Sequence, residues 1–240
     1  MNSNKMIELL NRLVPEEGTV EDIIEKVNLF RITSSAPRMP LSYDPGIIIL
    51  AQGQKRIFLG DDVYVYNPLN YLVLSVPLPL ECETTASPEE PMLGIKIKTD
   101  AKIVGEILLT IDSVQQNIKS IPKGIYSAPL DNLLIDAAVR LLEALSSPAD
   151  SRFLGPMIVS EIIYRVLCGE KGDALRALAY RNQHFFQISR ILDKIHKSYG
   201  KKLDLNSLAL EAGMSISAFH SSFKSVTNMA PLQYIKNVRL

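Results

Sequence analysis

Two short stretches with helical apolar spacing lie on either side of a glycine near the end of the 240-residue chain, and no other feature constrains the fold as strongly. Asp204 is suited to cap the first stretch, whose apolar residues recur three and four positions apart. Gly213 ends that stretch, as expected of a residue that adopts positive φ, and Ser215 is suited to cap the second. Two helices joined by a glycine turn predict a helix-turn-helix.

The second helix of this pair has two faces of different chemistry. The positions predicted to point inward are Ile216, Phe219, Phe223 and Val226. The positions predicted to point outward are Ser217, His220, Ser221 and Lys224. Short hydroxyls and an imidazole on one helix face suit the base edges of a DNA major groove. The alternative is that this face is simply exposed to solvent.

The net charge of zero conceals an uneven distribution along the chain. Residues 186–240 contain eight basic and three acidic side chains, a net charge of +5, which leaves −5 for the preceding residues. A basic segment after an acidic body favours contact with a polyanion such as DNA, although a chance excess on a solvated surface gives the same count.

Residues 212–240 resemble the first helix-turn-helix of the AraC/XylS family of transcription regulators. The resemblance covers the turn from Ala212 to Ser215, the inward phenylalanines, Lys224 and the Pro-Leu-Gln-Tyr run that starts at Pro231. It implies that Ser217, His220 and Ser221 read bases and that Lys224 lies near the phosphates.

Three positions depart from the family pattern. Ser221 stands where an arginine is common, which removes a charge from the reading face. Asn228 replaces a glycine after the second helix, and asparagine tolerates the left-handed conformation that such a turn needs. Ala230 replaces a serine before Pro231 and lacks the side-chain oxygen of a helix cap, which is worth about 0.5–2 kcal/mol.

The resemblance also implies a second helix-turn-helix, which this sequence does not contain because it ends at Leu240, inside the linker helix. One reading unit contacts fewer phosphates and bases than two. We therefore expect weaker DNA binding, with an affinity that depends less on salt concentration. Two hypotheses therefore stay open. The chain is either a sequence-specific DNA-binding regulator or a truncated ligand-binding and dimerisation module that does not bind DNA effectively by itself.

The body of the chain alternates short apolar runs with turn residues. Strands are predicted at residues 46–52, 55–59, 63–67, 71–76, 80–85 and 93–98. Alternation of Ile95, Lys96, Ile97 and Lys98 is typical of a half-buried strand. Residues 37–98 resemble the cupin-like sensor domain found in a branch of the same family. We therefore expect an α+β chain, with an antiparallel cupin-like β-barrel followed by helices and a small all-α helix-turn-helix unit.

The predicted domains are a sensor and dimerisation domain at 1–185 and an incomplete DNA-binding domain at 186–240. Within the first, the β-barrel spans about 28–110 and helices about 130–185. The resemblance implies a small-molecule effector in the barrel, whereas the alternative is a barrel filled by its own side chains. An apolar stripe predicts a helix that either packs on its own domain or pairs two subunits, and we expect a homodimer. The stripe consists of Leu134, Ala137, Ala138, Leu141, Leu142 and Leu145.

Several classes of protein are disfavoured by the residues available. The histidines His184, His196 and His220 all follow the predicted barrel, and Cys82 and Cys168 have no ligand-like spacing, so no metal site is expected. No phosphate loop, dinucleotide fingerprint or nucleophile elbow occurs, so we expect neither an enzyme nor a cofactor. No signal peptide or membrane span is predicted, which favours the cytoplasm. The family resemblance implies DNA as partner and a contact with RNA polymerase.

Overall fold

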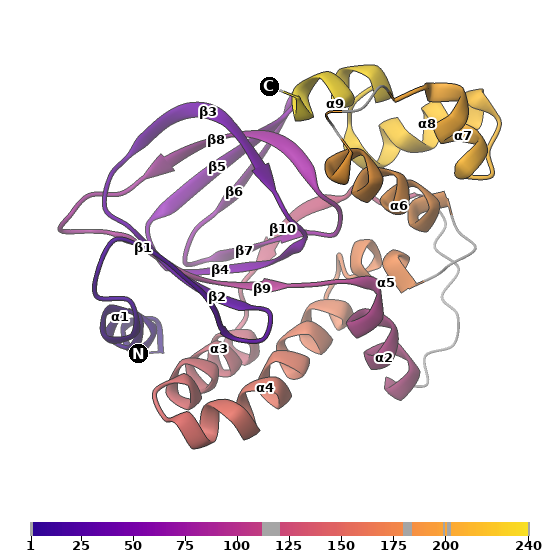
Figure 1. Cartoon of the computed structure of the whole chain (residues 1–240). Coiled ribbons are helices and arrows are strands. Elements are labelled where there is room, and N and C mark those ends of the chain that lie inside the picture. Colours follow the sequence, from indigo (N-terminus) through magenta and orange to yellow (C-terminus); the bar gives the residue numbers. More distant parts are fainter. Residues whose placement is uncertain (1, 112–120, 180–183, 199, 201–202, 240) are drawn as a thin grey trace.

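The computed structural model describes residues 2–111, 121–179, 184–198, 200 and 203–239 (Figure 1). It confirms the predicted α+β class: after one N-terminal helix come the antiparallel sheets, most of the helices follow, and the described chain ends in a helix-turn-helix region. The larger sheet lies between the smaller sheet and a layer of helices, so that it forms the middle of the N-terminal part (Figure 1).

The larger sheet has six antiparallel strands. In spatial order they are β1 (Gly18–Ile24), β2 (Val27–Ile32), β9 (Met92–Lys98), β4 (Gly46–Gln52), β7 (Asn70–Leu74) and β10 (Ile125–Pro129). The central strand β4 is buried from Gly46 to Ala51, on both of its faces. Burial of both faces explains why its sequence is a continuous apolar run rather than an alternating one.

The smaller sheet has four antiparallel strands. In spatial order they are β3 (Ala36–Tyr43), β8 (Leu78–Thr85), β5 (Gln54–Leu59) and β6 (Asp62–Tyr66). A tight turn from β6 to β7 connects the two sheets, and the Ser127 hydroxyl of β10 donates to the Val65 carbonyl of β6 at 2.7 Å.

The closed barrel expected from the sequence is replaced by two stacked sheets. Within the described residues no hydrogen-bonded ladder joins one sheet to the other. In the part of the chain that the structure describes, strand β3 pairs only with β8, and it is exposed along most of its length. Its Pro37 and Pro40 have no N–H to donate, which suits an edge strand and prevents regular pairing beyond it.

All six strands predicted from the sequence are present, with ends displaced by at most two residues. Four further strands were not predicted: β1, β2, β3 and β10. The strand-rich region extends from residue 18 to residue 129 rather than from 28 to 110. Helix α2 (Ala101–Ile111) also occupies a stretch in which strands were expected to continue.

Helices α1 (Asn2–Leu13), α3 (Asn132–Leu145) and α4 (Pro148–Cys168) form the layer on the larger sheet. The apolar stripe predicted on α3 is buried within this chain. Helix α4 begins earlier than the predicted helix at 156–167, because Ser147 caps it and Pro148 occupies its first turn. Pro156, at which the helix was expected to begin, lies inside it. A proline is well tolerated in a first turn, where its missing N–H has no intrahelical partner.

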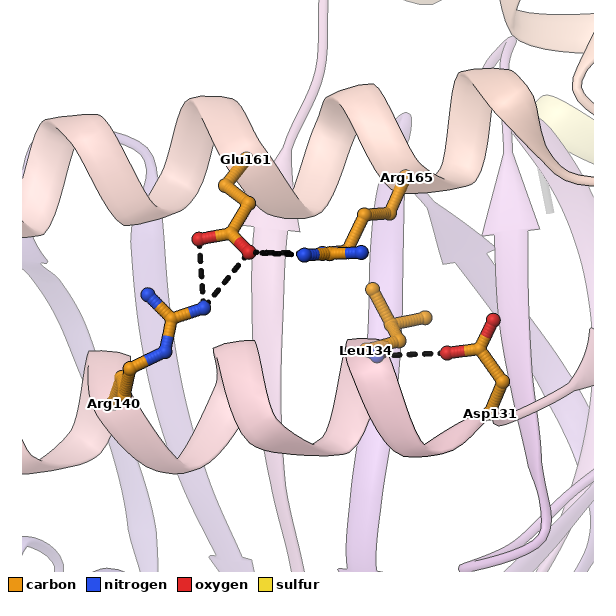
Figure 2. Close-up of polar contacts among 5 residues, drawn as sticks. All are labelled: Asp131, Leu134, Arg140, Glu161 and Arg165. Atoms are coloured by element: carbon orange, nitrogen blue, oxygen red, sulfur yellow. Dashed lines mark hydrogen bonds and ion pairs between the residues drawn. The ribbon is translucent and has the colours of Figure 1, made fainter.

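An ion-pair bridge joins α3 to α4 (Figure 2). The Glu161 carboxylate of α4 accepts hydrogen bonds from Arg140 of α3 at 2.7 and 2.8 Å and from Arg165, one turn along α4, at 2.6 and 2.9 Å. Burial acts to raise the pKa of Glu161, but the hydrogen bonds from both arginines outweigh it and lower that pKa. Nearby, the Asp131 carboxylate caps α3 by accepting from the Leu134 amide at 2.8 Å (Figure 2).

The remaining helices follow α4 in the sequence. They are α5 (Asp173–Ala179), α6 (His184–Lys197), α7 (Leu205–Glu211), α8 (Ile216–Thr227) and α9 (Pro231–Val238). Helices α6 to α9 lie together at one end of the sheets (Figure 1). Across the described parts of the chain, no helix is long and apolar enough to cross a membrane.

Candidate nucleic-acid interface

The turn between α7 and α8 is built from the capping residues that the sequence indicates. The Asp204 carboxylate accepts from the Ser207 amide at 2.9 Å and starts α7. Gly213 adopts φ of +67° and closes the turn, and the Met214 amide donates to the Ala209 carbonyl at 3.0 Å. The Ser215 hydroxyl then accepts from the Ala218 amide at 3.3 Å and starts α8. These contacts fix the angle at which α8 leaves α7.

Three aromatic rings form the inner support of α8. The rings of Phe219 and Phe223 have centroids 5.5 Å apart, and Phe223 meets the Tyr234 ring of α9 edge-on at 5.2 Å. All three side chains are fully buried. Edge-to-face packing of this kind adds to the stabilisation from burial, so α8 is held rigidly.

The predicted inward position of Ile216 is wrong. Its side chain is 54% exposed, because Ile216 is the first residue of α8 and lies before the turn that contacts the aromatic core. Helical spacing alone placed it with Phe219 and Phe223. An exposed isoleucine at the start of α8, beside the predicted reading residues, adds an apolar group to this end of the helix.

The four predicted interface residues lie along the side of α8 away from its core. Ser217, Ser221 and Lys224 are exposed, and His220 is partly exposed with its ring edge-on to Phe219. Among the described residues Lys224 makes no ion pair. The arrangement presents hydroxyls, an imidazole and one cation on a rigid helix, without internal partners for the cation.

The end of α8 is attached to the smaller sheet. Asn228 adopts φ of 58°, the left-handed conformation that the sequence predicts for it. Its side-chain amide donates to the Leu59 carbonyl at 3.0 Å and to the Asp62 carboxylate at 3.1 Å. The Asp62 carboxylate also pairs with Lys123 at 2.5 Å. A residue that differs from the family pattern therefore anchors the helix-turn-helix to the smaller sheet.

A second anchor lies on α9. The Tyr234 hydroxyl donates to the Pro77 carbonyl at 2.6 Å and lies 2.8 Å from the His196 Nε2 atom of α6. Since the phenolic proton is directed to Pro77, Nε2 must carry the proton of the second hydrogen bond. Burial lowers the pKa of His196, and nearby Asp44 partly opposes that effect. Neutral His196 thus joins α6 to α9 where both meet the sheets.

The start of α9 lacks a side-chain cap at Ala230, as its sequence predicts. Pro231 nevertheless occupies the first turn and is buried. Across the described parts of the chain, no group of three or more histidine, cysteine or acidic side chains is placed to hold a metal ion. The polar surface of α8 is therefore the feature of the C-terminal part with the clearest chemistry.

Two stretches of the sequence match known families. Residues 23–174 match the family described as the AraC-type transcriptional regulator N-terminus. Residues 195–236 match the bacterial regulatory helix-turn-helix proteins of the AraC family. A search of curated proteins finds no match.

Solved structures resemble the chain more distantly. ToxT from Vibrio cholerae strain SCE256 with a bound unsaturated fatty acid is 12% identical, with 92% of this chain and 96% of that chain covered and a TM-score of 0.40. ToxT from Vibrio cholerae O395 bound to (E)-4-(8-methylnaphthalen-1-yl)but-3-enoic acid is 15% identical, with 88% and 98% covered and a TM-score of 0.42. The AraC-like transcriptional activator CuxR is 11% identical, with 89% and 75% covered and a TM-score of 0.35.

Proposed function

The chain belongs to the AraC family of transcriptional regulators, and from that premise we propose that it binds specific DNA sequences through α8 and senses a small molecule through its N-terminal sheets. We further propose a division into a sensor domain at 1–185 and a DNA-binding domain at 186–240, with the cytoplasm as the site of action. Family members regulate transcription, which confirms the prediction that the chain is not an enzyme.

The observation that carries the DNA-binding proposal is the outer face of α8. Ser217 and Ser221 can donate to or accept from base edges, and the His220 imidazole can do the same with a longer reach. Lys224 lies two turns beyond Ser217, where it can meet the phosphate backbone. The aromatic support beneath this face limits the rearrangement that binding would require.

We add Ile216 to the proposed interface. Exposed at the N-terminal end of α8, it can contact a thymine methyl group, the apolar feature of the major groove. Recognition helices often contact bases through their N-terminal residues. The sequence offered no sign of this role, because Ile216 shares the apolar periodicity of the core residues.

We also propose a homodimer, with α4 in place of α3 as the pairing surface. The α3 stripe is covered by the chain itself, whereas α4 exposes Phe153 to 74%, Met157 to 61% and, along the same side, Tyr164. Their spacing of four and seven residues forms one apolar stripe. Such a stripe can pack against its own copy about a two-fold axis, and the dimer would carry two copies of α8.

The DNA-binding proposal is tested by fluorescence anisotropy with duplexes from the region upstream of the gene. Titrations are made at several salt concentrations, against a scrambled duplex of equal length. We expect preferential binding that weakens steeply with salt and is lost in the Ser217→Ala/His220→Ala/Lys224→Ala variant. Lys102→Ala, which removes a cation from the sensor part, is the matched control and should bind normally.

If the chain binds neither duplex at low salt, the DNA-binding proposal for this chain is wrong. The chain would then act as a sensing and dimerising module. Equal affinity for both duplexes would show that the chain binds DNA without sequence specificity.

A further inference from the structure

A cleft of about 770 Å³ lies between the outer face of the smaller sheet and α9. One wall comes from β3, β5 and β8, and the other from the α8–α9 turn and α9, which lies beside β8 (Figure 1). On the sheet wall, Phe58 and Glu81 are paired, on the side opposite to buried Ile57 and Cys82. The cleft is therefore outside the stacked sheets, and its volume is typical of a small-molecule site.

Hydrogen bonds on each side of the cleft hold its two walls together. The Asn228 amide donates to the Leu59 carbonyl after β5 at 3.0 Å. The Tyr234 hydroxyl of α9 donates to the Pro77 carbonyl before β8 at 2.6 Å. Because the walls are attached to each other at two points, the cleft is preformed, which lowers the free-energy cost of binding.

A guanidinium group forms part of the sheet wall. The guanidinium carbon of Arg38 lies 4.2 Å from the centroid of the Phe58 ring. The Nε atom of Arg38 donates to the Glu81 carboxylate at 2.7 Å, and its Nη2 atom donates to the same oxygen. Held between an aromatic ring and a carboxylate, the half-exposed guanidinium offers a planar surface on which another ring can stack.

Two side-chain amides face the cleft from α9. They belong to Gln233 and Asn237, one turn apart, and the Gln233 Nε2 atom donates to the Asn237 Oδ1 atom at 2.7 Å. Among the described residues nothing donates to the Gln233 Oε1 atom, so it can accept from a ligand. The Asn237 Nδ2 atom is directed at the Met229 sulfur at 3.6 Å, a weak acceptor that a ligand carbonyl can replace. The α9 wall thus suits a group that both donates and accepts.

The charges of the cleft are balanced. Arg38 and Glu81 are the charged side chains that line it in the part of the chain that the structure describes, and they form an ion pair. An anionic ligand would lie close to the Glu81 carboxylate, and a cationic one close to the Arg38 guanidinium. Phe58, Pro79 and Met229 supply apolar surface. A neutral ligand with an apolar ring therefore fits best.

We propose that this cleft binds a neutral aromatic amide, with its ring stacked on Arg38 and its carboxamide hydrogen-bonded to Gln233 and Asn237. The inference rests on the proposed sensing function, to which it gives a site and a class of ligand. A ligand that contacts both walls stabilises the attachment of α9 to the smaller sheet, because it binds only while the two are together.

Three probes of nearly equal shape test the class of ligand. Benzamide is neutral, sodium benzoate is anionic, and benzamidine is cationic at neutral pH. Titrations of the whole chain followed by saturation-transfer NMR give the dissociation constants. We expect a value on the order of 1 mM for benzamide, as usual for so small a ligand, and values roughly fivefold or more higher for both charged probes.

Substitutions on both walls test the site. Arg38→Met and Gln233→Leu should each weaken benzamide binding roughly fivefold or more. Arg56→Met is the matched control, because Arg56 also approaches the Phe58 ring, at 5.3 Å, and pairs with Glu83, but does not line the cleft. It should bind benzamide as the unchanged chain does. Benzamide at ten times its dissociation constant should raise the thermal midpoint of the unchanged chain and of Arg56→Met by roughly 3–6 °C.

Tighter binding of benzoate or benzamidine than of benzamide would reject the neutral class of ligand. Unchanged benzamide binding in both Arg38→Met and Gln233→Leu would reject the cleft. If benzamide does not bind to a chain that binds its preferred DNA duplex, the cleft is rejected and the DNA-binding proposal stands. Benzamide binding that depends on Arg38, in a chain that binds neither duplex, would support the cleft and reject the DNA-binding proposal.

Discussion

The side-chain amide of Asn228 donates to the carboxylate of Asp62 across 3.1 Å, and this hydrogen bond joins the end of α8 to the β5–β6 turn. The same carboxylate pairs with Lys123, so its charge is held in place. Gly60 allows the close approach, since its Cβ position would lie 3.2 Å from the Asn228 amide nitrogen. The position that differs from the family pattern has thereby gained a contact that a glycine could not make.

Replacing Asn228 by glycine should separate the two roles of this residue. Asn228→Gly keeps the left-handed conformation but removes both hydrogen bonds, with an expected loss of about 1–3 kcal/mol because one acceptor is charged. Asn228→Ala removes the same bonds and adds a left-handed strain of roughly 1–2 kcal/mol. Urea unfolding of the unchanged chain, Asn228→Gly and Asn228→Ala measures both losses of unfolding free energy.

A double-mutant cycle with Asp62→Asn isolates the contact itself. If Asn228 acts through Asp62, the combined variant should lose less than the sum of the single losses. Full additivity would mean that the amide is held by the Leu59 carbonyl alone.

Lys224 and the residues that precede it on α8 should affect DNA binding in different ways. Lys224→Ala should weaken binding to all sequences alike and reduce the slope of log affinity against log salt by about 1. Ser217→Ala and His220→Ala should cost about 1–3 kcal/mol on the preferred site only. Anisotropy at four salt concentrations, on preferred and scrambled duplexes, compares them. A change of slope in Ser217→Ala would contradict its proposed role.

Ile216 should contribute a base-specific apolar contact without supporting the fold. Ile216→Ser is expected to leave the thermal midpoint nearly unchanged, since the side chain is mostly exposed, and to weaken binding to the preferred site. Substituting uracil for individual thymines removes one methyl group at a time and should reproduce that loss at one position. A large fall in midpoint would instead place Ile216 in the core of the helix-turn-helix.

The exposed stripe of α4 should control the oligomeric state. We expect Phe153→Ser/Met157→Ser to be monomeric under conditions in which the unchanged chain is dimeric, as measured by light scattering during gel filtration. Leu69→Ser, which changes an exposed leucine in the β6–β7 turn, is the matched control. A monomeric unchanged chain, or a variant that remains dimeric, would reject this surface.

Local conformational signals in the sequence were sufficient to predict the turns of the helix-turn-helix. Asp204, Gly213, Ser215 and Asn228 each adopt the conformation expected of them, because capping and positive φ depend on a few neighbouring backbone groups. Ile216 was misplaced because helical periodicity does not reveal how far a core extends along a helix. The apolar stripe of α3 similarly indicated burial but not which surface would cover it.

Two features of the sheets could not be predicted because they depend on distant parts of the chain. The prolines of β3 are unfavourable inside a sheet, and only the position of this strand at an edge makes them acceptable. Alternation of Ile95, Lys96 and Ile97 was typical of a strand with one face in water. In the structure both faces are covered, by helices and by the second sheet, so Lys96 points into the protein.

Acidification should destabilise the folded chain at His196, because the buried imidazole is unfavourable when charged. Because burial lowers the pKa of His196 in the folded chain, the unfolded chain takes up its proton first as the pH falls below about 6.5. Its contribution to stability is therefore complete above that pH and is lost as the pH falls towards the folded pKa, with a slope of up to about 1.4 kcal/mol per pH unit. Urea unfolding at pH 7.5, 6.5 and 5.5 should show this slope in the unchanged chain and a smaller one in His196→Gln. Equal slopes in the two proteins would exclude His196 as the cause.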